Sequence, residues 1–260
     1  MIDAVMQAVR TVAQQEIVPR YLNVARQRKA DGSLITDADL ATQEALSHAL
    51  REILPAAVVG EEMTEREQVE QWLAGDAGLW CMDPIDGTSN FVNGLPYFAV
   101  SVALMRRGRS VLGVVYNPVM DEMFHATKGG GAYLNGEKLP IRTHAPPLSG
   151  AMANVDLKRL GNRLAREICT GRPFSSQRNY GSCALEWCYT AAGRFDLSLH
   201  GGQKLWDYAA GSLILEEAGG SMCGFDQDDF WAEPPWQRST IAALDPELFI
   251  KWRDWVRSHR

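Results

Sequence analysis

The segment from Trp80 to Phe91, WCMDPIDGTSNF, constrains the fold of this chain more than any other. It begins with apolar residues that suit a buried strand, and it places Asp83 and Asp86 three positions apart around a proline. Pro84 fixes its own φ angle and favours an extended Asp83, while Gly87 permits a sharp change of direction. We therefore expect a strand that ends abruptly, with carboxylates gathered at its end.

The oxygen atoms of this segment suit a hard divalent cation. We expect the carboxylates of Asp83 and Asp86 and the carbonyl of Ile85 to converge on one point, and such ligands favour Mg²⁺ or Mn²⁺ over softer metals. Thr88 adds a hydroxyl beside that point, placed to orient a metal-bound water. Asp, Pro and Gly are also ordinary turn residues, so the segment taken alone fits a simple turn equally well.

Two further motifs favour the metal site over the turn. Gly60-Glu61-Glu62 follows the apolar run Ala56–Val59, and Leu205-Trp206-Asp207 opens an apolar helical segment downstream. In this order the motifs GEE, DPIDGT and WDxAAG resemble the inositol monophosphatase family of metal-dependent phosphatases, from about Thr36 to Gly220. The resemblance implies alternating layers of helices and sheets, with an active site between two lobes.

The patterning agrees with an α/β (α+β) layered sandwich, as in inositol monophosphatase and fructose-1,6-bisphosphatase. The chain has 260 residues, 46% of them hydrophobic, which is enough for a sizeable core. Apolar spacing predicts helices over 1–28, 36–53, 65–73, 157–170, 182–192, 206–218 and 246–257. Strands are predicted over 56–59, 79–82, 98–105, 111–116, 122–126, 151–155 and 241–244, with a hairpin turn at 135–136.

The segment Thr143–Gly150 contains two prolines and is the best candidate for a boundary between lobes. We expect an N-terminal lobe, residues 1–145, that carries the metal-binding motifs. A C-terminal lobe, residues 146–260, is expected to complete the active site.

The resemblance implies a role for each matched residue. Glu61 would bridge a metal ion and the nucleophilic water, Asp207 would bind a second metal opposite Asp86, and Asp39 would orient the water through Thr88. The alternatives are structural, because adjacent glutamates usually lie in solvent and an Asp often stabilises a helix N-terminus. The expected cofactor is Mg²⁺, as two or three ions, with Mn²⁺ as a substitute. The expected metal ligands are Glu61, Asp83, Ile85, Asp86 and Asp207.

Two basic residues and a second glutamate complete the implied site. Lys29 resembles a basic residue near the mobile loop of the family, and Arg28 fits the spacing nearly as well. Glu62 neighbours Glu61 and is placed to contact a further metal.

Substrate contacts are expected from short segments at helix starts. Backbone N–H groups of residues 87–89 can hold phosphate oxygens. Gly181-Ser182-Cys183 resembles the family's substrate-facing element, although Cys183 replaces the usual alanine, and a capped helix is the simpler interpretation. The expected substrate-binding residues are Asp86, Gly87, Thr88, Ser89, Gly181, Ser182, Cys183, His200 and Asp207.

His200 departs from the family pattern. It stands seven residues before Asp207, where inositol-hydrolysing relatives often place a glutamate that accepts hydrogen bonds from ring hydroxyls. A neutral imidazole has one acceptor nitrogen, whereas a protonated ring would attract a second anionic group on the substrate. The departure leaves the phosphatase chemistry intact and predicts a broader or shifted choice of substrate.

These motifs predict a Mg²⁺-dependent phosphate monoesterase in which water attacks directly, without a phosphoenzyme. Inositol monophosphate is the leading substrate, and fructose bisphosphate, histidinol phosphate, glycerol phosphate and adenosine bisphosphate are alternatives handled by relatives. No histidine pairs with a serine or cysteine at triad spacing, which disfavours covalent catalysis. A regulatory binding protein that keeps the fold is the alternative from another functional class.

Composition also bears on partners and location. The net charge of −6 argues against a general nucleic-acid binder. The sequence lacks an apolar stretch near the ~18 residues of a membrane span and a signal pattern at its start, so we expect a cytoplasmic protein. Five cysteines without a C-x-x-C pair indicate reduced thiols rather than a zinc site. The resemblance further implies a homodimer and sensitivity to lithium.

Overall fold

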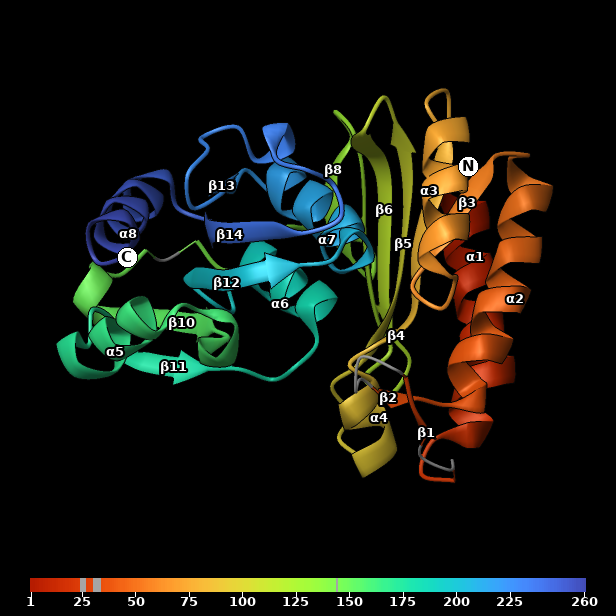
Figure 1. Cartoon of the computed structure of the whole chain (residues 1–260), viewed down its shortest axis with the longest axis horizontal. Coiled ribbons are helices and arrows are strands. Elements are labelled where there is room, and N and C mark those ends of the chain that lie inside the picture. Colours follow the sequence, from red (N-terminus) through yellow and green to blue (C-terminus); the bar gives the residue numbers. More distant parts are fainter. Residues whose placement is uncertain (24–26, 30–33, 144) are drawn as a thin grey trace.

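Helices and sheets alternate in layers across the molecule (Figure 1). The computed structural model describes residues 1–23, 27–29, 34–143 and 145–260. A seven-stranded sheet and a five-stranded sheet each have helices on both faces, and one pair of helices lies between them. This arrangement confirms the predicted layered α/β (α+β) sandwich.

The larger sheet carries the first two acidic motifs. Its strand order is β3-β4-β5-β6-β7-β8-β9, with β3 parallel to β4 and the remaining pairs antiparallel. The strands are β3 (Ala57–Gly60), β4 (Leu79–Asp86), β5 (Ala99–Arg106), β6 (Arg109–Asn117), β7 (Glu122–Thr127), β8 (Gly131–Leu134) and β9 (Glu137–Lys138).

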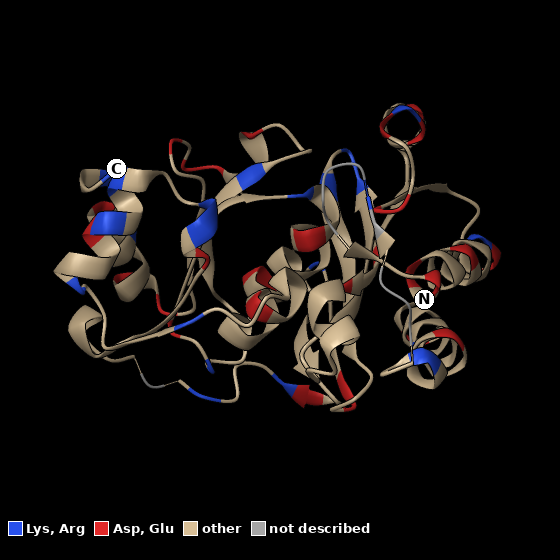
Figure 2. Cartoon of the chain, turned by 60° about the horizontal axis from the view of Figure 1, so that its bottom comes forward, with Lys and Arg blue, Asp and Glu red and all other residues tan. Residues whose placement is uncertain are grey.

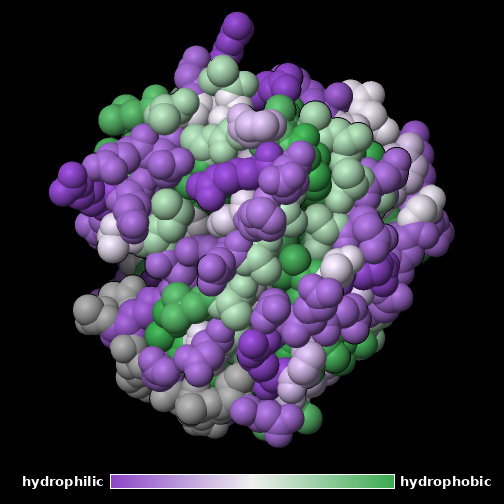
Figure 3. Space-filling view, turned by 90° about the vertical axis from the view of Figure 1, so that its right-hand side faces the viewer, coloured by the Kyte–Doolittle hydropathy of each residue, from purple (hydrophilic) through white to green (hydrophobic). Residues whose placement is uncertain are grey.

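Helices α1 (Ile2–Val12) and α2 (Asp37–Ile53) cover the outer face of this sheet, and α3 (Glu65–Ala74) packs beside β3. Residues of α1, α2, β4, β5 and β6 form one apolar core between the helices and the sheet. The opposite side of the helices faces outward and is mainly hydrophilic (Figure 3), with apolar residues such as Leu40 and Leu73 exposed among polar ones.

The middle layer consists of α6 (Cys183–Ala191) and α7 (Leu205–Glu217). Helix α7 is apolar on all sides, as expected for a helix buried between two sheets. Its backbone approaches β6 so closely that a Cβ atom on Gly113 would lie 2.7 Å from the Ala210 carbonyl oxygen. Glycine at this position therefore lets the helix that carries Asp207 pack tightly against the sheet that carries Asp83 and Asp86.

The smaller sheet has the order β11-β10-β12-β14-β13, and helices α5 and α8 cover its outer face. The indole of Trp252 in α8 donates to the Ser198 carbonyl at 3.1 Å, which fixes that helix to the sheet. These elements are β10 (Met152–Val155), α5 (Asn162–Gly171), β11 (Ser176–Arg178), β12 (Leu197–Gln203), β13 (Ser221–Cys223), β14 (Arg238–Ala243) and α8 (Pro246–Ser258).

The remaining elements are short. A ribbon of β1 (Gln27–Arg28) and β2 (Leu34–Ile35) and helix α4 (Thr88–Asn93) lie near the end of β4 (Figure 1). One π-helical turn spans Ala13–Ile17, and 3₁₀ turns span Val18–Arg20, Leu148–Gly150, Leu157–Arg159 and Phe230–Ala232.

The prediction of one N-terminal helix as far as Arg28 is wrong. The α-helix ends at Val12 and loosens into the π-helical and 3₁₀ turns, after which the chain becomes extended at Tyr21. Pro19 explains the loss of regularity, because it lacks an N–H and its ring disfavours the preceding helical turn.

The predicted helix 157–170 is also wrong, because it is two elements. A 3₁₀ turn covers Leu157–Arg159, and α5 begins only after the extended Gly161. The sequence pattern does not predict strands β11, β12 and β13, and β12 contains Gly201 and Gly202, which weaken the usual strand signal.

The chain crosses from the larger to the smaller sheet between Lys138 and Met152, and the division into lobes at residues 145 and 146 stays a prediction. Along the described ribbon, segments coloured for basic residues and segments coloured for acidic residues are interspersed (Figure 2). Among the helices described, not one combines the length and the apolar character needed to cross a bilayer.

Candidate active site

Parallel pairing of β3 and β4 places Glu61 beside Asp83. Gly60 pairs with Met82, and the Glu61 N–H donates to the Met82 carbonyl at 3.3 Å. The carboxyl ends of parallel strands lie at the same edge of a sheet, so the residue after β3 lies next to the end of β4. Two motifs about twenty residues apart therefore meet.

An irregularity in β4 gathers its two carboxylates. Asp83 pairs with Ser101 and Asp86 pairs with Ala99. An advance of three residues on β4 therefore lies opposite an advance of two residues on β5. The extra residue forms a bulge, which bends a strand and redirects its side chains. The Ile85 N–H donates to the Asp83 carboxylate at 3.0 Å, which holds this side chain at the bend.

Gly87 then reverses the chain. Its φ angle is 93°, in the left-handed region that favours glycine, and a Cβ atom there would lie 3.2 Å from the carbonyl oxygens of Tyr97 and Gly181. Helix α4 starts at the next residue, so Thr88 and Ser89 occupy its first turn beside the end of β4.

Helix α7 brings the third motif to the same point. The Ser101 hydroxyl donates to the Trp206 carbonyl at 3.1 Å, and Asp207 is the next residue. The Asp207 carboxylate also accepts from the Lys204 N–H at 2.8 Å, so it caps the start of its own helix, in agreement with the structural alternative.

Asp83, Asp86 and Asp207 each contribute a carboxylate oxygen to a cluster whose atoms lie within 4.8 Å of one another. We call these three residues the acid cluster. Burial raises the pKa of Asp83 and of Asp207 well above the usual range, and the charge of Glu61 raises both further. Burial also raises the pKa of Asp86, to about 6. Carboxylates so close together repel one another, and a bound divalent cation removes this repulsion, so the donor set fits Mg²⁺.

The first turn of α6 holds Asp86 in place. One carboxylate oxygen of Asp86 accepts from the Ser182 hydroxyl at 2.5 Å and from the Ala184 N–H at 2.7 Å. Ser182 therefore contacts a member of the acid cluster, in addition to any role with substrate. Residues 86 and 184 are far apart in the sequence, and no local pattern indicates this contact.

Glu186 supports the same turn, and sequence reasoning does not single it out. It lies one helical turn into α6 and accepts from the N–H groups of Tyr180 and Gly181 at 3.2 and 3.1 Å. Burial raises the pKa of Glu186 to about 7. Gly181 adopts a φ angle of 80°, and Cys183 is the first residue of α6, with burial raising the pKa of its thiol.

Asp39 and Thr88 meet as the family resemblance implies. The Thr88 hydroxyl lies 3.4 Å from the Asp39 carboxylate and 3.1 Å from the Ile85 carbonyl. Asp39 is also part of a capping box at the start of α2, where it accepts from the N–H and hydroxyl of Thr36. Burial raises the pKa of Asp39 to about 6. The structural and the functional interpretations of Asp39 are thus compatible.

Lys29 joins the site through the glutamates of the first motif. Its ammonium lies 2.9 Å from Glu61 and 2.7 Å from Glu62. Burial lowers the pKa of Lys29, but the two carboxylates outweigh burial and raise it overall. Burial raises the pKa of Glu62 to about 7. The side chain of Arg28 lies outside the described residues.

His200 lies in β12 with 4% of its surface exposed. Its Nδ1 atom accepts from the Gly202 N–H at 3.0 Å, which places the ring proton on Nε2, 3.6 Å from the Asp156 carboxylate. Burial lowers the pKa of His200 to about 4. The ring is therefore neutral near pH 7, and its acceptor nitrogen is already used. Its predicted contact with substrate stays a prediction.

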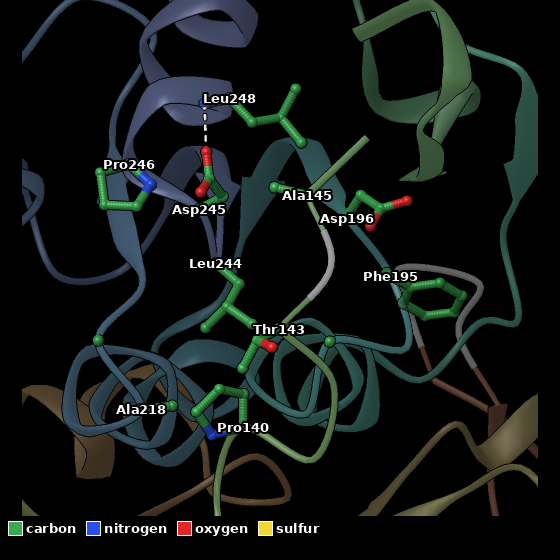
Figure 4. Close-up of a pocket in the computed structure, with 12 residues that line it drawn as sticks. Pro140, Thr143, Ala145, Phe195, Asp196, Ala218, Leu244, Asp245, Pro246 and Leu248 are labelled. Atoms are coloured by element: carbon green, nitrogen blue, oxygen red, sulfur yellow. Dashed lines mark hydrogen bonds between the residues drawn. The ribbon is translucent and has the colours of Figure 1, made fainter. Parts of the chain in front are cut away.

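A separate hollow of about 170 Å³ lies at the junction of the sheets and contains none of the predicted site residues (Figure 4). It is lined partly by the connecting segment at Pro140 and Thr143 and by the start of α8 at Pro246. The chemistry of the acid cluster, rather than the size of a hollow, locates the candidate active site.

Comparison with known proteins agrees with this geometry. The sequence model of the inositol monophosphatase family matches residues 1–252. The chain belongs to the inositol monophosphatase family. An inositol-1-monophosphatase of Mesorhizobium japonicum is 35% identical over 230 residues, covering 87% of this chain and 84% of that protein. A protein of Pasteurella multocida named Nus factor SuhB is 36% identical over 76% of this chain and 74% of its own length.

Solved structures show the same fold. An IMPase of Thermotoga maritima superposes with a TM-score of 0.81 at 28% identity, covering 98% of this chain and 97% of that one. The suhB protein of Bartonella henselae gives a TM-score of 0.84 at 26% identity, covering 99% of this chain and 98% of that one. These comparisons confirm the predicted family and class of enzyme, a phosphatase. The roles of individual site residues stay predictions.

Proposed function

We propose that this chain is a Mg²⁺-dependent phosphate monoesterase whose leading substrate is inositol monophosphate. The acid cluster is the observation that carries the proposal, because three carboxylates within 4.8 Å of one another, two of them buried and the third half-buried, need positive charge to be held together. Family membership supports the reaction class, and the Mesorhizobium relative named an inositol-1-monophosphatase supports the substrate.

Residues at the edge of the larger sheet would bind the metal ions. Asp83, Asp86, Asp207, Glu61 and the Ile85 carbonyl would hold two or three Mg²⁺ ions. Bound Mg²⁺ lowers the pKa of water, neutralises the phosphate and stabilises the departing alkoxide.

Thr88 and Asp39 would orient the attacking water. The Thr88 hydroxyl donates to Asp39 or to the Ile85 carbonyl and keeps its lone pairs free to accept from water. Asp39, with a pKa of about 6, is suited to receive a proton through Thr88 near neutral pH. Water would attack phosphorus directly, so the new P–O bond forms as the ester P–O bond breaks.

Backbone N–H groups complete the proposed phosphate site. The N–H groups of the first residues of a helix lack intrahelical acceptors. Thr88 and Ser89 are the first two residues of α4, directly after Asp86 and Gly87. Gly181, Ser182 and Cys183, at the start of α6, would form the opposite wall of this site.

The test is release of phosphate from a panel of sugar and polyol phosphates, with Mg²⁺ and with excess chelator. We expect hydrolysis that requires Mg²⁺ and is fastest with inositol monophosphate. Full activity in chelator would refute the metal-dependent mechanism. Faster hydrolysis of fructose bisphosphate, histidinol phosphate or adenosine bisphosphate would keep the mechanism and replace the substrate.

Two further proposals follow from the family: the chain forms a homodimer, tested by sedimentation, and lithium inhibits it, tested by assays with LiCl. A cytoplasmic location is proposed from the sequence pattern, and fractionation of cells tests it. The absence of nucleic-acid binding also stays a prediction, and a nucleic-acid-binding assay tests it.

A further inference from the structure

The segment that joins β13 to β14, residues 224–237, contacts all three layers of the molecule, and we call it the strap. It begins and ends in the smaller sheet, and the carboxylate of Asp229 lies 3.1 Å from the guanidinium of Arg109 in β6 of the larger sheet. The ring of Phe230 packs in the apolar core around α6 and α7. The strap therefore links the two sheets and the helices between them.

Arg238, the first residue of β14, holds the second half of the strap in one shape. Its Nε atom donates to the Glu233 carbonyl at 3.1 Å, and its Nη2 atom donates to the carbonyls of Trp231 and Glu233 at 3.3 and 2.8 Å. Arg238 is buried, and among the described residues no carboxylate forms an ion pair with it. The rings of Tyr208, Phe230 and Trp231 lie 4.9–5.3 Å from its guanidinium carbon. Ring faces attract a cation, so these rings and carbonyls stabilise the buried charge.

The strap is attached to the start of α7. The hydroxyl of Tyr208 donates to the Pro235 carbonyl at 2.6 Å, and the same tyrosine ring lies against the Arg238 guanidinium. Tyr208 directly follows Asp207 in the first turn of the helix. Because the residues of one helical turn share a single hydrogen-bonded backbone geometry, a shift of Tyr208 also shifts Asp207.

The strap is also attached to α3, the helix that follows Glu61. The ring centroids of Trp236 in the strap and Trp72 in α3 lie 5.7 Å apart. One turn before Trp72, the Gln68 side chain donates to the carbonyls of Gly60 and Glu61 at 3.0 and 3.4 Å. Helix α3 therefore holds the backbone of Glu61, and the strap contacts this helix through Trp236.

We propose that Arg238 is a positioning residue that sets the separation between Asp207 and Glu61, the proposed metal ligands at the start of α7 and at the end of β3. It shapes the strap, and the strap joins the two helices that support these acids. Mg²⁺ requires nearly ideal octahedral geometry, so the separation of its ligands matters. This inference rests on the proposed metal-dependent function and adds a distant support to its metal site.

Arg257 provides a matched control, because it is also an arginine that donates to carbonyls of the strap. Its Nε atom donates to the Phe225 carbonyl at 3.0 Å, and its Nη2 atom donates to the Gly224 carbonyl at 3.1 Å. It lies in α8 and holds the first half of the strap. Loss of Arg257 therefore loosens the strap where it contacts α8 and leaves the contacts of Arg238 in place.

The first test measures hydrogen exchange of the metal-free protein by mass spectrometry in the parent and in variants. We expect Arg238→Met to speed exchange in α3 and in the first turn of α7 at least ~10-fold, and Arg238→Lys to restore part of the protection. Tyr208→Phe removes one hydroxyl only, so it tests the attachment to α7 even if Arg238→Met does not fold. Arg257→Met should leave both helices as in the parent. Parental exchange of α7 in Tyr208→Phe, or equal effects of Arg257→Met, overturns the proposal.

Metal binding separates positioning from a general loss of stability. Calorimetry with Mg²⁺ should show an affinity ~10-fold lower in Arg238→Lys and Tyr208→Phe, whereas Arg257→Met should keep the parental affinity even where urea unfolding shows an equal loss of stability. Parental Mg²⁺ affinity in Arg238→Lys and Tyr208→Phe overturns the inference alone. A parent that does not bind Mg²⁺ would refute the proposed function, and hydrogen exchange would still decide whether Arg238 positions the two helices.

Discussion

The hydroxyl of Ser101 donates to the carbonyl of Trp206 at 3.1 Å. This contact joins the sheet that carries Asp83 and Asp86 to the helix that carries Asp207. Ser101 is the β5 partner of Asp83, and Trp206 immediately precedes Asp207. One hydrogen bond between a strand and a helix therefore helps to set the distance between acids from two different layers.

Replacing Ser101 with Ala should weaken metal binding more than it weakens the fold. Loss of one buried hydrogen bond costs about 1 kcal/mol of unfolding free energy, and loosening the support of a ligand lowers metal affinity ~10-fold or more. The measurements are urea unfolding and the Mg²⁺ dependence of phosphate release.

Ser110→Ala is the matched control, because Ser110 donates to the Ala209 carbonyl of the same helix at 2.6 Å but lies away from the acids. It should show the loss of stability alone. Equal effects of Ser101→Ala and Ser110→Ala on Mg²⁺ dependence would show that the Ser101 contact has no special role.

Mg²⁺ should stabilise the protein through the acid cluster. Ligand binding to the folded state raises the unfolding free energy, by about 2.7 kcal/mol at a hundredfold excess over Kd. Asp86→Asn removes one charged ligand. It should abolish most of this gain in unfolding free energy and lower turnover at least ~100-fold. Differential scanning fluorimetry with and without Mg²⁺ measures the first effect. A stabilisation by Mg²⁺ that Asp86→Asn leaves intact would place the cation elsewhere.

Thr88→Ala should lower kcat while KM and the affinity for Mg²⁺ change little. The Thr88 hydroxyl, 3.4 Å from Asp39, orients the water rather than the substrate in our proposal. Thr88→Ser keeps the hydroxyl and should retain most of the activity. Steady-state kinetics of both variants provide the comparison, and a change confined to KM would contradict the assigned role.

Glu186 should make stability depend on pH. Its folded-state pKa of about 7 lies above the usual value of 4.5, so the folded state retains a proton that the unfolded state loses. The contribution of this carboxyl is complete below pH 4.5 and is lost as the pH rises to 7, by an amount on the order of 1–3 kcal/mol.

Glu186→Gln keeps an oxygen that can accept from the Tyr180 and Gly181 N–H groups, and it does not titrate. Urea unfolding in saturating Mg²⁺ should therefore show a smaller decline between pH 4.5 and 7 in this variant than in the parent. Glu216→Gln, on the exposed side of α7, should follow the parent. Parallel pH profiles for the parent and Glu186→Gln would disprove the effect.

Local sequence determined the parts of the site that short-range geometry controls. Pro84 and Gly87 fix the end of β4, so the closeness of the Asp83 and Asp86 carboxylates follows from residues within one turn. The apolar pattern after Trp206 likewise predicts α7 and places Asp207 in its first turn. The order of the three acidic motifs along the chain is by itself enough to indicate the family.

Tertiary structure alone decided which distant residues support those acids. Parallel pairing brings Glu61 to Asp83, and the start of α6 holds Asp86 through Ser182, because packing of separate layers joins segments that no local pattern links. The same reason explains His200. Its position in the sequence indicates a substrate contact, but in the folded chain burial keeps the ring neutral and its Nε2 atom faces the Asp156 carboxylate.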